Sequence, residues 1–260
     1  MIHPHSREFE SLADVQRLLL PDAPEIRGLD HAVHYQPAFI AAGDYYDLMP
    51  LSRFMPEGWA DQHGVDAWGV MIADVSGHGP AAAMEAVQFD AILRTYRGDE
   101  PPQGPAGALT YANRHFFSRR PRRHFMTVFA ALHRPDLAQL QWCSAGHHAA
   151  LLRRGNDVFR VGEEGDIPLG IDRDYRFCNR EQAIKPGDAL VLCTDGVLEA
   201  RDSSGTPFGL HRVEALLRQA PDPASAIRDT LVNALHAHQG GAVGEDDQTL
   251  LVLRCLPAAD

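Results

Sequence analysis

The spacing of apolar side chains changes along the chain, and each change predicts a different kind of element. Between Ser6 and Leu20, apolar residues recur every three or four positions, which predicts an amphipathic helix that ends at Pro21. From Leu29 onward, short apolar or alternating runs bounded by Pro, Gly and Asp predict strands. These runs are Ala32–Tyr35, Phe39–Ala42, Tyr45–Leu51, Trp68–Val75, Phe125–His133, Leu137–Ser144, Ala149–Arg153, Val158–Val161, Tyr175–Ala183, Ala189–Cys193 and Thr249–Leu256.

Longer runs with a helical period predict further helices. They are Ala81–Tyr96, with Pro80 in its first turn, Pro105–Phe117, Leu210–Gln219 and Pro223–His238. Many strands follow one another and the helices are grouped in pairs, without the strict alternation of strand and helix that is typical of a parallel sheet. The order of elements therefore predicts an α+β layered sandwich, and a chain of 260 residues suits one such domain.

Composition and charge indicate a soluble globular protein and exclude two classes of partner. The chain is 45% hydrophobic and 23% charged, and it has no apolar run near the roughly 18 residues of a membrane span. Its formal charge of −11 argues against general nucleic-acid binding, which needs a basic surface. The first residues lack the pattern of a signal peptide, so we expect a cytoplasmic protein. The four cysteines form no C-x-x-C pair, which predicts reduced thiols.

One basic segment stands out against the acidic background. Residues Asn113–Phe125 contain five arginines and two histidines, among them Arg119, Arg120, Arg122 and Arg123. Such a run is most often a solvated loop. The alternative is a docking patch for an acidic or phosphorylated partner.

Aspartates stand at the ends of several hydrophobic runs. They are Asp44 in A-G-D-Y-Y-D, Asp74 in A-D-V-S-G-H-G, Asp195 in C-T-D-G-V-L-E-A, and Asp246 with Asp247 in E-D-D-Q-T. A sheet can direct carboxylates at its strand ends toward one point, where they repel one another unless cations are present. Oxygen ligands without nearby Cys or His favour Mg²⁺ or Mn²⁺. Two such ions about 4 Å apart can activate water for attack on phosphorus.

Six motifs together resemble a known family. In order along the chain they are A-G-D-Y-Y-D, D-V-S-G-H-G-P-A-A, S-A-G-H, I-P-L-G, T-D-G-V and D-D-Q-T. Their types and order are similar to the SpoIIE-type bacterial branch of the metal-dependent protein phosphatases, the PPM superfamily, over about residues 8–255. The resemblance implies a four-layer αββα sandwich of two antiparallel sheets flanked by helices. It also implies a helical extension at residues 1–24 and a catalytic domain at residues 25–257.

The resemblance further implies a site that holds two Mn²⁺ or Mg²⁺ ions. In it, Asp74 corresponds to the carboxylate that bridges both ions, and Val75 offers its backbone carbonyl. Asp195 and Asp246 correspond to ligands of one ion, and Asp44 corresponds to a ligand that binds the other through water. Asp247 is the alternative to Asp246, although the alignment of D-D-Q-T favours Asp246.

The histidines of the motifs have two interpretations each. Ser76 stands where type 2C relatives have the histidine proposed as general acid, so His78 does not inherit that role by alignment. His78 still suits proton transfer to the leaving serine oxygen, or it braces the metal loop. His147 is expected to brace its loop or to face the substrate. No counterpart of the phosphate-binding arginine of eukaryotic relatives is evident, which leaves the metals and Arg119–Arg123 for that task.

By resemblance, the chain is a phosphoprotein phosphatase that acts on phosphoserine or phosphothreonine. The implied substrate is a phosphorylated STAS-domain anti-sigma-factor antagonist in a partner-switching pathway. Regulation is expected from a separate protein or from a homodimer formed through the helix Ser6–Leu20. Two alternatives are a non-catalytic interaction module with the same fold and an enzyme for small phosphate esters.

Overall fold

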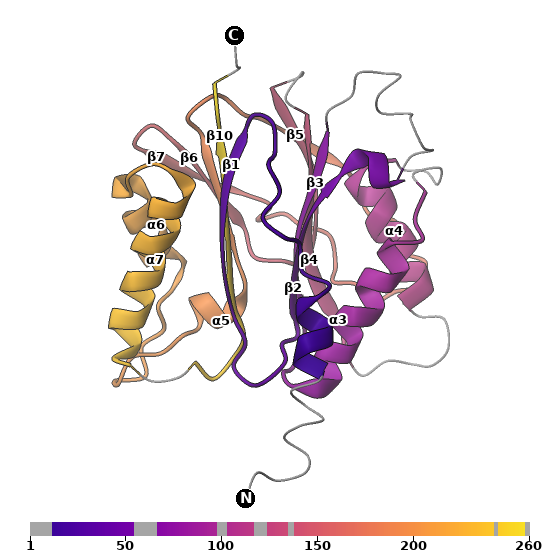
Figure 1. The fold of residues 1–260 in the computed structure, drawn as a ribbon, viewed down its shortest axis with the longest axis horizontal. Helices are drawn as coiled ribbons and strands as arrows, with labels where there is room; N and C mark the ends of the chain where they lie inside the picture. Colours follow the sequence, from indigo (N-terminus) through magenta and orange to yellow (C-terminus); the bar gives the residue numbers. More distant parts are fainter. Residues whose placement is uncertain are drawn as a thin grey trace, which may run out of the picture.

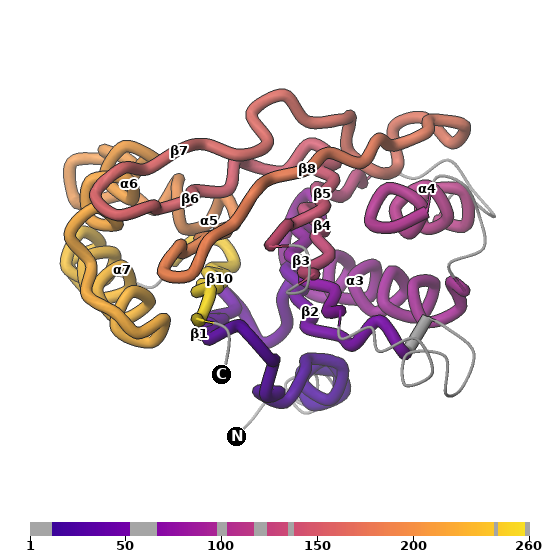
Figure 2. The backbone as a smooth tube through the Cα atoms, turned by 90° about the horizontal axis from the view of Figure 1, so that it is seen from above, coloured from indigo at the N-terminus to yellow at the C-terminus, as the bar shows by residue number. Residues whose placement is uncertain are grey.

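Two β-sheets stack face to face, and helices cover the outer face of each (Figures 1 and 2). The computed structural model describes residues 12–54, 67–97, 103–116, 124–134, 138–241 and 244–257, without the side chains of residues 53 and 54. The helices α6 and α7 lie on one side and α3 and α4 on the other, so that the layers are helix, sheet, sheet and helix. This arrangement confirms the predicted α+β sandwich.

Each sheet has five strands, and all neighbouring strands are antiparallel. The first sheet contains, in spatial order, β1 (Leu29–Gln36), β10 (Gln248–Cys255), β9 (Ala189–Cys193), β6 (Ala150–Arg154) and β7 (Asp157–Val161). The second contains β2 (Asp44–Pro50), β3 (Trp68–Val75), β4 (Met126–Arg134), β5 (Gln139–Ala145) and β8 (Arg180–Ala183). The helices are α3 (Pro80–Leu93), α4 (Pro105–Phe116), α5 (Asp195–Leu198), α6 (Leu210–Gln219) and α7 (Ala224–Gln239), with a 3₁₀ turn η1 (Leu51–Phe54).

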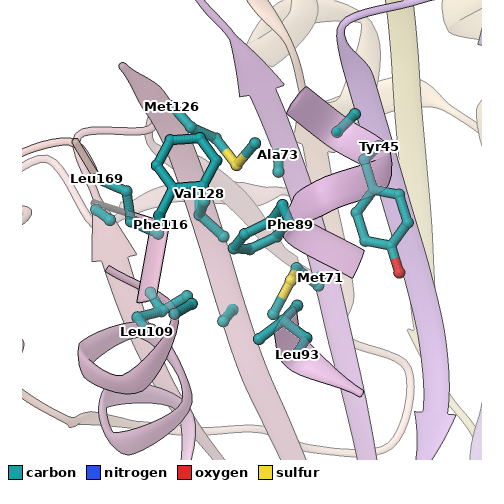
Figure 3. Packing of buried hydrophobic residues seen from close by; sticks show 14 of the residues in the cluster. Tyr45, Met71, Ala73, Phe89, Leu93, Leu109, Phe116, Met126, Val128 and Leu169 are labelled. Atoms are coloured by element: carbon teal, nitrogen blue, oxygen red, sulfur yellow. The ribbon is translucent and has the colours of Figure 1, made fainter. Parts of the chain in front are cut away.

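Hydrophobic packing joins the four layers at three levels. Between the second sheet and its helices, Phe89 of α3 and Phe116 of α4 are fully buried beside Met126 and Val128 of β4 (Figure 3). A second cluster fills the space between the sheets, and a third packs the first sheet on α6 and α7. The strand β9 is buried along its whole length because it is covered on both faces, which explains its uninterrupted apolar sequence.

The strand predicted at Phe39–Ala42 is wrong, since this segment is a series of bends between β1 and β2. At its end, the backbone groups of Ala42 and of the following Gly43 bond to side chains instead of to a neighbouring strand. The side-chain amide of Gln16 donates to the carbonyl of Ala42 and accepts from its N–H, and the carboxylate of Asp247 accepts from Gly43. These contacts satisfy the backbone and replace the hydrogen bonds of a sheet.

The strand predicted at Tyr175–Ala183 is correct only for its last four residues, which form β8. The preceding residues are extended but bond to side chains. Phe177 N–H donates to the hydroxyl of Thr110, and Cys178 N–H donates to the carboxylate of Asp166. The short helix α5 was not predicted, because four residues are too few to show a helical period.

The N-terminal helix is described over residues 12–17, and the predicted residues before them lie outside the described part. Ala13 of this helix packs against Ala41 and Ala83. The division into an extension of residues 1–24 and a catalytic domain of residues 25–257 stays a prediction. Among the described residues, no helix is long and apolar enough to cross a membrane.

Candidate metal centre

The aspartates singled out in the sequence lie at one edge of the sandwich. Asp44 begins β2 and lies directly opposite Asp74, the next-to-last residue of β3, in the antiparallel register. Asp195 follows the end of β9, and Asp246 precedes the start of β10. In antiparallel neighbours the end of one strand lies beside the start of the next, so each sheet contributes one pair. The edge is the lower one in Figure 1, where α5 lies.

Three of these carboxylates repel one another. Burial is the main reason that the pKa of Asp74 is raised to about 8, and the neighbouring carboxylates of Asp195 and Asp246 contribute to the same rise. Burial also raises the pKa of Asp195, again with a contribution from Asp246. Carboxylates that share a site in this way are stabilised in the ionised form by a cation.

The donor set fits a hard divalent cation, because all of its members are oxygen ligands. Asp195 and Asp246 line a cavity of about 750 Å³ that opens at the edge of the sandwich, together with His78. Within the described residues, no three His, Cys, Asp or Glu side chains already enclose one point. A divalent cation would favour the ionised form of these carboxylates.

Asp44 lies behind this cluster and is only 1% exposed. Its Oδ2 accepts hydrogen bonds from the hydroxyls of Thr194 at 2.8 Å and Thr249 at 2.6 Å. Burial and the charge of Asp74 raise its pKa, whereas the two hydroxyls lower it. Because Thr249 belongs to β10 and Thr194 directly follows β9, these bonds also tie the two sheets together. The sequence reasoning missed them, although each threonine lies within a motif, T-D-G and D-D-Q-T.

Asp246 and Asp247 have different surroundings. Asp247 is 3% exposed, and its two carboxylate oxygens accept from the backbone N–H groups of Ala38 at 2.8 Å and Gly43 at 2.7 Å. Asp246 is partly exposed in the cavity, and its Oδ1 accepts from the N–H of Asp247. The side chain of Asp247 is thus committed to the loop before β2. Asp246 faces Asp195 and Asp74.

Glycines allow the chain segments of the site to approach closely. A Cβ atom on Gly196 would lie 2.0 Å from the carbonyl oxygen of Asp247, so only glycine fits after Asp195. A Cβ atom on Gly43 would lie 2.9 Å from the Cβ of Ala82 in α3. Both glycines directly neighbour an aspartate of the site, which explains the G-D and D-G pairs in the sequence.

The loop after β3 is anchored to β4 and carries His78. Ser76 N–H donates to the carbonyl of Phe125, and the hydroxyl of Ser76 accepts from the N–H of Phe125. Val75 N–H donates to the carbonyl of Gly43 across the sheet at 3.4 Å. The ring of His78 is exposed at the cavity and stacks on Phe39, with ring centroids 5.0 Å apart.

His147 lies in the interior, with 5% exposure, and its Nδ1 is 2.9 Å from the hydroxyl of Thr127. Burial is the main reason that its pKa is lowered to about 3, and the neighbouring His148 contributes to the same decrease. The ring is therefore neutral and buried, and its role as a loop brace or a substrate contact stays a prediction. Arg119, Arg120, Arg122 and Arg123 lie outside the described residues, so their docking role stays a prediction.

Comparisons with known proteins agree with this fold. The family model described as Stage II sporulation protein E (SpoIIE) matches residues 64–256. The phosphoserine phosphatase RsbU of Bacillus subtilis (strain 168) is 30% identical over 260 residues, which covers 95% of this chain and 70% of RsbU.

Two solved structures show the same fold. The SiaA-PP2C domain of Pseudomonas aeruginosa has a TM-score of 0.82 at 21% identity, with 96% of each chain covered. The catalytic domain of the serine threonine protein phosphatase PstP, solved in complex with two manganese ions, has a TM-score of 0.57 at 17% identity, with 88% of this chain and 99% of that chain covered. The family match and the identity to RsbU show that the chain belongs to the SpoIIE-type branch of the metal-dependent serine/threonine protein phosphatases.

Proposed function

We propose that the chain hydrolyses phosphoserine or phosphothreonine on a protein substrate with the help of two Mn²⁺ or Mg²⁺ ions. The observation that carries this proposal is the placement of Asp74, Asp195 and Asp246 at strand ends on one edge of the sandwich, where Asp195 and Asp246 line an open cavity. RsbU, the relative at 30% identity, is named a phosphoserine phosphatase, and PstP was solved with two manganese ions.

In this proposal each residue of the edge has its own task. Asp74 would hold both ions, the carbonyl of Val75 would add a neutral ligand, and Asp195 and Asp246 would hold one ion. Asp44, buried behind Asp74, would hold the other ion through water. When bound, the ions supply activation of water and neutralise charge on the phosphoryl oxygens. Asp247 is assigned to the brace of the loop before β2, because both of its oxygens accept backbone N–H groups.

His78 is the protein group placed to move a proton in this site. Its exposed ring at the cavity, held by the stacking on Phe39, suits protonation of the leaving serine oxygen. The same stacking also supports the alternative role of a brace. A His78→Gln variant separates the two roles, because loss of a proton donor lowers kcat for a serine phosphate far more than for an aryl phosphate, whose leaving group needs no proton.

The proposed substrate is a phosphorylated STAS-domain anti-sigma-factor antagonist in the cytoplasm, and its dephosphorylation would release a sigma factor from its inhibitor. This step rests on the relationship to RsbU. Regulation is assigned to a partner protein or a homodimer at the N-terminal helix. Val15 in this helix is 51% exposed and Leu18, just after it, is 84% exposed, so apolar surface remains for a partner.

The experiment compares an aryl phosphate with a phosphorylated STAS-domain protein, each with Mn²⁺ and with chelator. Hydrolysis of both that needs Mn²⁺ and is lost in Asp74→Asn supports the proposal. Hydrolysis of the aryl phosphate alone favours an enzyme for small esters. If neither compound is hydrolysed while the chain still binds the STAS-domain protein, the non-catalytic module is correct.

A further inference from the structure

One cationic side chain lies in the acidic cavity. Arg201 follows α5 by three residues and lines the cavity with Asp195 and Asp246. The other charged side chains along the same wall are Glu199, Asp202 and Glu245. A guanidinium among so many carboxylates would be expected to form an ion pair with one of them.

Arg201 is instead held by the backbone. Its Nη1 donates to the carbonyl of Gly205 at 2.8 Å, and the strand-like pairing of Arg201 with Pro207 fixes its backbone. Over the ranges that the structure describes, no carboxylate lies within ion-pair distance of Arg201. The guanidinium is therefore oriented by one neutral bond, and its charge is not neutralised by a protein group.

The turn that orients Arg201 is itself well ordered by hydrogen bonds. Asp202 Oδ1 accepts from the N–H of Ser204 at 2.8 Å, from the hydroxyl of Ser204 at 2.6 Å and from the N–H of Thr206 at 2.9 Å. These bonds lower the pKa of Asp202, with the hydroxyl of Ser204 as the largest cause. The carboxylate of Asp202 is thus used to build the turn, although it is adjacent to Arg201 in the sequence.

We propose that Arg201 binds the phosphoryl oxygens of the substrate, an inference that rests on the proposed phosphatase activity. A guanidinium presents two parallel N–H donors that match two oxygens of a phosphate monoester. Asp195 and Asp246, which are assigned to the cations, line the same cavity as Arg201, so an anion that enters it can contact both the metals and the guanidinium. Arg201 would thus do the work of the phosphate-binding arginine of eukaryotic relatives, for which the sequence shows no counterpart near the N-terminus.

The test measures p-nitrophenyl phosphate hydrolysis and its inhibition by inorganic phosphate, with Mn²⁺ present, for the wild type and variants. Arg201→Ala should raise both KM for the ester and the inhibition constant of phosphate by about tenfold or more, because one charge-assisted hydrogen bond is lost. Arg201→Lys should fall between Ala and wild type, since an ammonium keeps the charge without the paired donors. The Mn²⁺ concentration for half-maximal activity should stay unchanged.

Two controls separate phosphate binding from effects on charge or on the turn. Arg218→Ala removes the same charge from an exposed position on α6, outside the cavity, and should leave KM and phosphate inhibition unchanged. Ser204→Ala weakens the turn but keeps Arg201, and it should have a smaller effect than Arg201→Ala.

A stabilisation assay gives a readout that does not depend on turnover. Phosphate added to the Mn²⁺-loaded protein should raise the unfolding temperature of the wild type more than that of Arg201→Ala. The inference is overturned if Arg201→Ala leaves KM and phosphate inhibition within twofold of the wild type, or if Ser204→Ala reproduces its whole effect. A wild type without Mn²⁺-dependent hydrolysis would instead refute the proposed function.

Discussion

Replacing the two adjacent aspartates that directly precede β10 one at a time should separate a metal ligand from a structural brace. Asp246→Asn should abolish Mn²⁺-dependent hydrolysis and leave the chelated protein as stable as the wild type, or more stable. Asp247→Asn should destabilise the fold even in the presence of chelator. The two residues are neighbours with the same side chain, so each variant is the matched control of the other.

The difference in stability follows from their hydrogen bonds. Each oxygen of Asp247 accepts one buried N–H, from Ala38 and from Gly43, and Asn has only one oxygen. The variant would place an amide NH₂ against a backbone donor, and the loss of a charged acceptor from a buried donor costs about 2–4 kcal/mol. Asp246 accepts only the N–H of Asp247, which Asn can still do, and its charge repels Asp74 and Asp195.

The assay is urea unfolding of the chelated proteins, followed by Mn²⁺ titration of activity. The free energy of unfolding should fall by about 2–4 kcal/mol for Asp247→Asn and change by less than about 0.5 kcal/mol, or rise, for Asp246→Asn. Equal destabilisation by both substitutions in chelator would refute the reasoning. So would an Asp246→Asn protein that keeps wild-type activity at the same Mn²⁺ concentration.

Further expectations concern packing and pH. Gly196→Ala should destabilise the fold by more than about 3 kcal/mol and abolish activity, because the new Cβ would lie 2.0 Å from the carbonyl oxygen of Asp247. Urea unfolding and an activity assay check this expectation. Burial, with Asp195 and Asp246, raises the pKa of Asp74 to about 8, so protons compete with the cation for this carboxylate. The half-saturating Mn²⁺ concentration should therefore fall as pH rises from about 6.5 to about 8.5, and a constant value would contradict this expectation. His147 has a pKa lowered to about 3 by burial, against 6.5 in the unfolded chain, so its contribution to stability is complete above pH 6.5 and is lost as pH falls toward 3. Urea unfolding of His147→Gln across this window should show a flatter loss of stability than the wild type.

The sequence predicted the strand ends of the site better than the contacts around them. The run Trp68–Val75 and its partners placed the aspartates at strand ends because their apolar residues show a clear boundary. The roles of Thr194 and Thr249 depend on how the two sheets stack, which no local pattern encodes. The same limit applied to Asp247, whose partners lie more than 200 positions away in the chain.

The two errors in the element prediction have a common physical cause. Residues Phe39–Ala42 and the first part of Tyr175–Ala183 have the composition of strands, but side chains from distant elements satisfy their backbone groups. Gln16, Thr110 and Asp166 are the side chains involved. Local propensity decides a strand only where a neighbouring strand is available to pair with it.

We propose that carboxylates at one edge of the two sheets form one site for two divalent ions, which Asp74 would hold together. Calorimetric titration of Mn²⁺ into the wild type and into Asp74→Asn, with the folded state of both checked by circular dichroism, tests it most directly. The account predicts two ions per chain for the wild type and a loss of binding at both positions in the folded variant. Mn²⁺ binding to Asp74→Asn with wild-type stoichiometry and affinity would contradict it.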